Sequence, residues 1–163
     1  AQAPFVGALL RRYAASEISG GVETSGFFEW SAVEGFLEDL DFFFFDVKVL
    51  DGALHRRLTG QENDMLLDNL ARLARRCAPR ITVSVPLIDG VNAHDEFFEE
   101  LSYLCLRLGI SRMRLLPYHT LGRSKYEALG REYPMGDEGE LPPGAPERFV
   151  AAVRRYGLAC GVE

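Results

Sequence analysis

Short apolar segments alternate along the chain with longer segments in which apolar residues recur every three or four positions. The clearest short segment is 42–49, Phe-Phe-Phe-Phe-Asp-Val-Lys-Val, where apolar residues occupy both odd and even positions. That pattern indicates a strand covered on both faces, as in a parallel sheet flanked by helices. The other predicted strands are Gly21–Thr24, 81–88 and 112–118.

The longer segments predict amphipathic helices, because their apolar residues fall on one face at the helical period. In chain order they are 4–16, 30–40, 65–77, 97–108 and 147–156. Asn63 or Asp64 is placed to cap the third of them, and Asn92 can cap the fourth. The segment 50–63 is predicted to be a loop, and 158–162 a short final extension.

Strands and helices alternate, so the chain is predicted to be an α/β protein with an all-parallel sheet, or part of a TIM-type barrel. About four strands alternate with helices, and residues 1–163 are expected to form a single domain. Right-handed crossovers bring the carboxyl ends of the strands to one side of the sheet. Ligands of such folds bind at that edge, so polar residues near it are the candidates for a functional site.

Five polar residues fall at or near those strand ends: Glu23, Asp46, Lys48, Ser84 and His119. Asp46 and Lys48 have the same parity, so in a strand their side chains project to the same face. Charged groups there are costly to bury without partners or a ligand. The two residues form either a simple ion pair at a strand end or part of a binding site, and the convergence of all five residues on one rim favours the site.

Composition limits the classes of partner. The chain has 163 residues, of which 47% are hydrophobic and 26% charged, enough for one well-formed core. Its net charge of -6 and its pI near 5.2 argue against a nucleic-acid or anionic-membrane partner, because those partners select clustered Lys and Arg. No apolar run reaches the roughly 18 residues of a membrane span, and no signal peptide is visible, so a cytoplasmic setting is expected.

Cysteine and histidine give no metal signal. Cys77, Cys105 and Cys160 are too far apart for the short ligand spacings of a zinc site or an iron-sulfur cluster. They are predicted to be buried free thiols. His55 and His94 are predicted to be surface residues, in a loop and at a helix start.

Four motifs stand in a fixed order, and together they are more specific than any one of them. They are Glu23-Thr24-Ser25-Gly26, Asp46-Val47-Lys48, Pro86-Leu87-Ile88-Asp89-Gly90-Val91-Asn92, and Leu115-Leu116-Pro117-Tyr118-His119 followed by Leu121-Gly122 and Lys125-Tyr126. Over nearly its whole length the chain resembles the glycyl-radical-enzyme activating enzymes of the radical S-adenosylmethionine superfamily, of the pyruvate formate-lyase activating enzyme type.

That resemblance implies an oxidoreductase that cleaves S-adenosylmethionine reductively with a [4Fe-4S] cluster and generates a glycyl radical on a partner enzyme. The implied partners are a glycyl radical enzyme, pyruvate formate-lyase or a relative, and a reductant such as flavodoxin. The family holds its cluster with a Cys-x3-Cys-x2-Cys motif and the amino group of its substrate with a Gly-Gly-Glu segment. This sequence contains neither.

The chain is therefore expected to be a carboxyl-terminal fragment that lacks the first two strands of the family's six-stranded partial barrel. Such a fragment is expected to be inactive alone, with no cofactor bound. The outer edge of the strand Gly21–Thr24 would then be exposed, which allows self-association because uncovered strand edges invite pairing.

The resemblance also implies roles for single residues. Glu23 and Asp46 match two carboxylates that flank a monovalent cation, and Lys48 and His119 match positions that contact S-adenosylmethionine. No catalytic residue and no cluster ligand is expected in this chain. Ser84 stands where the type enzyme has an arginine, which removes a cation from the substrate rim.

Two alternatives to an activating enzyme stay open at this point. One is an inert scaffold or interaction domain, because the catalytic thiolates are absent. The other is a different α/β-barrel enzyme, such as a Schiff-base lyase in which Lys48 is the nucleophile. His119 taken alone is equally typical of a loop histidine bonded to nearby backbone.

Overall fold

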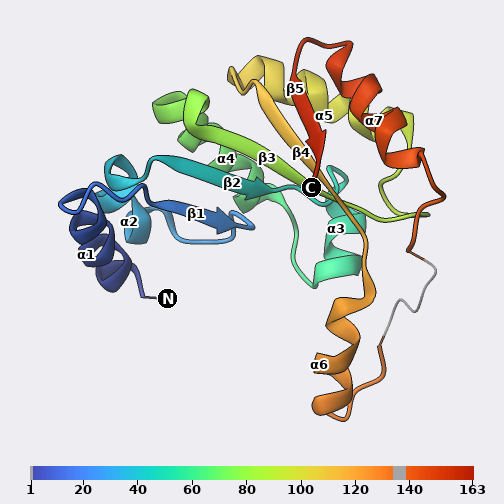
Figure 1. Ribbon diagram of the computed structural model, residues 1–163, viewed down its shortest axis with the longest axis horizontal. Helices are drawn as coiled ribbons and strands as arrows, with labels where there is room; N and C mark the ends of the chain where they lie inside the picture. Colours follow the sequence, from blue (N-terminus) through green and yellow to red (C-terminus); the bar gives the residue numbers. More distant parts are fainter. Residues whose placement is uncertain (1, 134–138) are drawn as a thin grey trace.

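Five parallel strands form one sheet, and each strand pairs with the next strand in the sequence (Figure 1). The computed structural model describes residues 2–133 and 139–163. The strands are β1 (Gly21–Thr24), β2 (Phe42–Asp46), β3 (Ile81–Leu87), β4 (Arg112–Pro117) and β5 (Ala159–Val162). The predicted α/β class with a parallel sheet is confirmed, and the segment expected to be a short extension forms a fifth strand.

Helices connect the strands in sequence. They are α1 (Ala3–Ala14), α2 (Trp30–Val33), α3 (Gly52–Thr59), α4 (Asp64–Cys77), α5 (Asp95–Leu108), α6 (Arg123–Ala128) and α7 (Ala145–Arg154), with 3-10 turns η1 (Glu34–Asp39), η2 (Ala78–Arg80) and η3 (Thr120–Gly122). None of the helices in the described part of the chain has the length and apolar character needed to span a membrane.

The hydrophobic core lies between one face of the sheet and the helices. Alternate strand residues point to that face, and Phe45, Val83 and Leu115 are completely buried there. Leu70 of α4 and Leu101 of α5 pack in the same cluster from the helical side. This layered packing fixes which residues face the opposite side of the sheet.

The opposite face is open, so the prediction that the 42–49 strand is covered on both faces is wrong. Phe42 is 37% exposed. Its ring lies over Gly21 of β1, where an added Cβ would come within 2.1 Å of the ring. Phe44 is covered by the guanidinium of Arg114, whose Cζ lies 3.6 Å from the ring centroid. On this face Phe42 thus packs over a glycine and Phe44 packs under an arginine, rather than either ring packing against a helix.

Two further expectations are corrected by the helices. The segment 50–63 contains α3. Asp51 caps its amino end, where its carboxylate accepts a hydrogen bond from Leu54 N, and Gly60 in the left-handed region caps its carboxyl end. The segment 30–40 is not one continuous helix. It divides into α2 and η1, and Gly35, a poor residue for a helix interior, lies just after the division.

β1 is one edge of the sheet, as the resemblance implies. It has only four residues, and β2 is its pairing partner in the described chain. Association of the protein through this edge stays a prediction.

Truncation of a core leucine tests the packing of the helical layer. Leu101→Ala should lower the free energy of unfolding by about 2–5 kcal/mol, because it leaves a cavity under the sheet. Leu106→Ala on the same helix is the matched control, since Leu106 is 46% exposed, and it should cost less than about 0.5 kcal/mol. Urea titrations of both variants measure the difference, and equal losses would contradict this packing.

Candidate functional site

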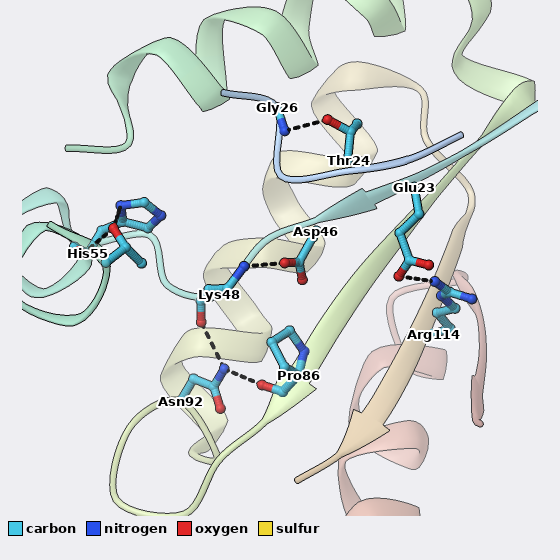
Figure 2. Close-up of polar contacts among 10 residues, drawn as sticks. Glu23, Thr24, Gly26, Asp46, Lys48, His55, Pro86, Asn92 and Arg114 are labelled. Atoms are coloured by element: carbon cyan, nitrogen blue, oxygen red, sulfur yellow. Dashed lines mark hydrogen bonds and ion pairs between the residues drawn. The ribbon is translucent and has the colours of Figure 1, made fainter. Parts of the chain in front are cut away.

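Three of the polar residues predicted from the strand ends, Glu23, Asp46 and Lys48, lie on the open face of the sheet (Figure 2). In the register of the strands, Glu23 lies beside Phe44, and Asp46 lies beside Ser84. Ser84 in turn lies beside Arg114. Because all pairs are parallel, these positions share one parity and one face.

Asp46 and Lys48 form an ion pair at the end of β2. The Lys48 ammonium donates a hydrogen bond to Asp46 Oδ2, and the two side chains are 35% and 21% exposed. Lys48 lies two residues beyond the last β2 residue. An ammonium has three donors, and Asp46 is its partner among the described residues, so the pair remains accessible to a ligand.

Glu23 forms an ion pair with Arg114 of β4. Arg114 Nη2 lies 2.7 Å from Glu23 Oε1, Nη1 lies 2.9 Å from Glu163 Oε2, and Nε donates to Ser84 Oγ at 2.6 Å. The same guanidinium stacks on Phe44. Its side chain is only 11% exposed, although it lies on the open face.

Arg114 is the functional candidate that sequence reasoning missed. The expectation that Ser84 removes a cation from this rim is corrected, because the neighbouring strand places a guanidinium over the serine. Two features of the sequence pointed to Arg114: its parity within a predicted strand, and the small side chain of Ser84 in the neighbouring strand. Only the register between β3 and β4 shows that these two residues are neighbours.

His119 lies apart from these contacts. It follows β4 directly before η3, its side chain is exposed, and its ring has no hydrogen-bond partner among the described residues. The structure therefore brings Glu23, Asp46 and Lys48 onto one rim, while no contact joins His119 to them.

Asn92 holds the ends of β2 and β3 together. Its side chain is completely buried, and its Nδ2 donates to Lys48 O at 2.8 Å and to Pro86 O at 2.7 Å. Its Oδ1 accepts from Ile88 N at 2.9 Å. The predicted capping role for Asn92 is wrong, because His94 occupies the cap of α5 and accepts from Phe97 N.

Two more buried asparagines hold rim loops in the same way. Asn63 Nδ2 donates to Leu50 O at 2.7 Å and more weakly to Val49 O, so it makes no side-chain cap on α4. Asn69 Nδ2 donates to Gly26 O and Phe28 O, both at 2.8 Å. Each amide thus satisfies two backbone carbonyls in the loop that follows a strand.

His55 is buried rather than on the surface as predicted, with 7% of its area exposed. Its Nδ1 lies 2.7 Å from Gln61 O, and a carbonyl oxygen can only accept, so Nδ1 carries the proton. His55 and Lys48 line a cavity of about 270 Å³, with Leu66 among its apolar walls. His94 is exposed, as predicted.

The cysteines of this chain do not fit a metal cluster. All three thiols are free and buried, as predicted. Burial raises the pKa of Cys105 to about 12 and that of Cys160 to about 11, and it also raises the pKa of Cys77. No group of three or more His, Cys, Asp and Glu in the described residues could hold a metal ion. Cluster ligands are therefore not found in the described part of the chain.

Removal of the Asn92 amide should weaken the whole rim. Asn92→Ala leaves two carbonyl oxygens and one amide nitrogen without their partner, and a loss of about 2–4 kcal/mol in the free energy of unfolding is expected. Asp89→Ala, in the same turn but exposed, is the control and should change it by less than about 0.5 kcal/mol. Urea titration gives both values, and a loss for Asn92→Ala no greater than for the control would contradict the bridging role.

The thiols should be unreactive in the folded protein. At about pH 8 the raised pKa values keep them protonated, and burial blocks access, so Ellman's reagent should label none of Cys77, Cys105 and Cys160 before unfolding and all three after it. The pKa values of Cys105 and Cys160 in the folded protein lie above the ordinary value of 9.0, so the protonated thiols stabilise the folded state below pH 9.0. This stabilisation is lost as the pH rises toward 11 and 12. Rapid labelling of the native protein would contradict the burial.

The chain matches several activating enzymes in sequence. It is 33% identical over 146 residues to the 4-hydroxyphenylacetate decarboxylase activating enzyme of Clostridioides difficile (strain 630), which covers 89% of this chain and 46% of the relative. It is 39% identical over 139 residues to the isethionate sulfite-lyase activating enzyme of Nitratidesulfovibrio vulgaris, which covers 84% and 45%. The chain spans about half the length of these curated relatives. No family model matches it.

Solved structures agree with the fold. A domain of pyruvate-formate lyase-activating enzyme from Bacteroides vulgatus superposes with a TM-score of 0.79 at 20% identity, over 99% of this chain and 91% of that one. A radical SAM methyltransferase from Sphaerobacter thermophilus gives 0.59 at 22% identity, over 91% and 42%. The chain thus has the partial-barrel fold of radical S-adenosylmethionine enzymes, and by sequence it is homologous to a part of the glycyl-radical-enzyme activating enzymes.

Proposed function

We propose that this chain forms the S-adenosylmethionine-binding rim of a radical S-adenosylmethionine activating enzyme, which generates a glycyl radical on a partner enzyme. The homology to activating enzymes supports the reaction class. The observation that supports the site most is the ion pair of Asp46 and Lys48, which lies partly exposed at the carboxyl edge of the sheet. In folds of this kind that edge binds the ligand.

Lys48 is suited to the carboxylate of S-adenosylmethionine. Its ammonium can donate to the ligand while it keeps the bond to Asp46, because one of three donors is used there. Asn92 holds the backbone carbonyl of Lys48, so the residue starts from a fixed backbone position. His119, with an exposed ring, can donate or accept a hydrogen bond toward the ribose or the adenine.

The charge of the rim matches this ligand. S-adenosylmethionine carries a sulfonium, an ammonium and a carboxylate, and its net charge at neutral pH is a single positive one. The rim has the cations Lys48 and Arg114 and the carboxylates Glu23, Asp46 and Glu163. The excess of one carboxylate favours a cationic ligand over an anionic one.

The redox part of the reaction lies outside the described residues. A [4Fe-4S] cluster would supply the electron for the cleavage of S-adenosylmethionine, and the buried thiols of this chain do not fit its ligands. The partner is proposed to be a glycyl radical enzyme, pyruvate formate-lyase or a relative, with a reductant such as flavodoxin. The relatives are named for different target enzymes, so the proposal extends to the class of partner alone.

The Schiff-base lyase is the less favoured function. A lysine nucleophile is activated in an apolar pocket or beside another cation. Lys48 instead has a carboxylate as its partner. Borohydride trapping with small carbonyl substrates should therefore leave Lys48 unmodified.

The complete reading frame that encodes this chain provides the direct test. It should encode Cys-x3-Cys-x2-Cys followed by Gly-Gly-Glu, and its anaerobically reconstituted product should form 5'-deoxyadenosine from S-adenosylmethionine with dithionite. Lys48→Met should weaken S-adenosylmethionine binding by about 10- to 100-fold, the worth of a charge-assisted hydrogen bond.

Arg107→Met is the matched control, because Arg107 is an exposed cation near the end of α5. It should leave S-adenosylmethionine binding unchanged. Equal binding by the wild type and Lys48→Met would remove Lys48 from the site. A product that contains the motifs and forms no 5'-deoxyadenosine would overturn the proposed function.

A further inference from the structure

Glu23 and Asp46 place two negative charges on the same face of neighbouring strands. In the register of β1 and β2, Glu23 lies beside Phe44, two residues before Asp46. Carboxylates at such positions repel each other unless positive charge lies close to both. That charge comes either from a bound cation or from side chains of the protein.

The structure supplies a cationic side chain for each carboxylate. Asp46 accepts a hydrogen bond from Lys48, and Glu23 Oε1 lies 2.7 Å from Arg114 Nη2. Figure 2 shows Glu23 turned toward Arg114 and Asp46 turned toward Lys48. These contacts do not fit an ion shared between the two carboxylates, since each is already directed at a nitrogen donor.

Arg114 is held where it is by more than one ion pair. Ser84 accepts from its Nε at 2.6 Å, Glu163 lies 2.9 Å from its Nη1, and the ring of Phe44 lies under its plane. Ser84 is completely buried, and its small side chain leaves room for the guanidinium above β3. A guanidinium stays charged at every ordinary pH and is weakly hydrated, which suits a permanent charge in a mostly buried position.

We propose that Arg114 is a built-in counter-ion of this rim and takes the place of the monovalent cation that the resemblance implies. It is a positioning residue: through Glu23 it sets the charge and the orientation of the β1 side of the site. Because Arg114 is covalently part of β4, this charge does not exchange with solvent and does not depend on which salt is present.

Thermal unfolding in different salts tests the proposal. The melting temperature of the wild-type chain should be the same in potassium chloride and in choline chloride at equal ionic strength. Arg114→Gln removes the counter-ion and leaves Glu23 and Glu163 without their cationic partner, so that they can bind an ion. In this variant potassium should raise the melting temperature saturably, by about 3 °C relative to choline, because an ion that binds the folded state stabilises it.

Arg112→Gln is the matched control. Arg112 lies on the same strand and the same face, but its partners are Thr82 Oγ1 and the backbone oxygen of Pro79 rather than a carboxylate. This variant should respond to potassium no more than the wild type does. A saturable potassium effect in the wild type overturns the proposal, and so does a folded Arg114→Gln protein without one.

Crystals of the wild type give a second measurement that does not depend on the folding of a variant. After a thallium(I) soak, the proposal expects no anomalous peak between Glu23 and Asp46, and a peak there overturns it. Neither experiment contains S-adenosylmethionine. A failure to bind that ligand would therefore count against the proposed function and would not affect the proposal that Arg114 is a counter-ion.

Discussion

One guanidinium connects the open face of this sheet from side to side. Arg114 projects from β4 and contacts Glu23 of β1, Phe44 of β2, Ser84 of β3 and Glu163, the residue after β5. In a flat sheet β1 and β4 would be about 14 Å apart, three strand spacings, so such contacts favour a sheet that curves toward this side. The same side chain thus links four strands of the curved sheet and contributes to the charge of its rim.

The loops of the rim depend on a second kind of constraint. Three buried asparagines donate to carbonyl oxygens in the loops that follow β1 and β2, and Asn92 also donates to Pro86 O near the end of β3. In this way the loops receive hydrogen bonds that the sheet no longer provides. The backbone oxygen of Lys48 accepts one of these hydrogen bonds, from Asn92, and this bond fixes the position of the residue. The carboxyl edge of the sheet is thus built from backbone held by the interior, while Lys48 and Asp46 above it remain partly exposed.

Local signals in the sequence predicted most of the helices and strands. They did not predict which residues far apart in the chain contact each other. The strand Gly21–Thr24 was predicted with its observed bounds, because glycines flank it and its neighbours have helical spacing. The helix α3 was missed although Asp51 and Gly60 are ordinary start and stop signals, since its few apolar residues gave a weak pattern. Parity placed Asp46 and Lys48 on one face. It could not pair Glu23 with Arg114, because that contact requires the curvature of the complete sheet.

The order of the strands has a consequence for how the protein assembles. Since every strand pairs with its successor, each new βα unit can add to the sheet as soon as it leaves the ribosome. The bond between Arg114 and Glu23 is different, because 91 positions separate the two residues. It can form only after four strands are in place, so the charged rim is completed late, on a sheet that is already folded.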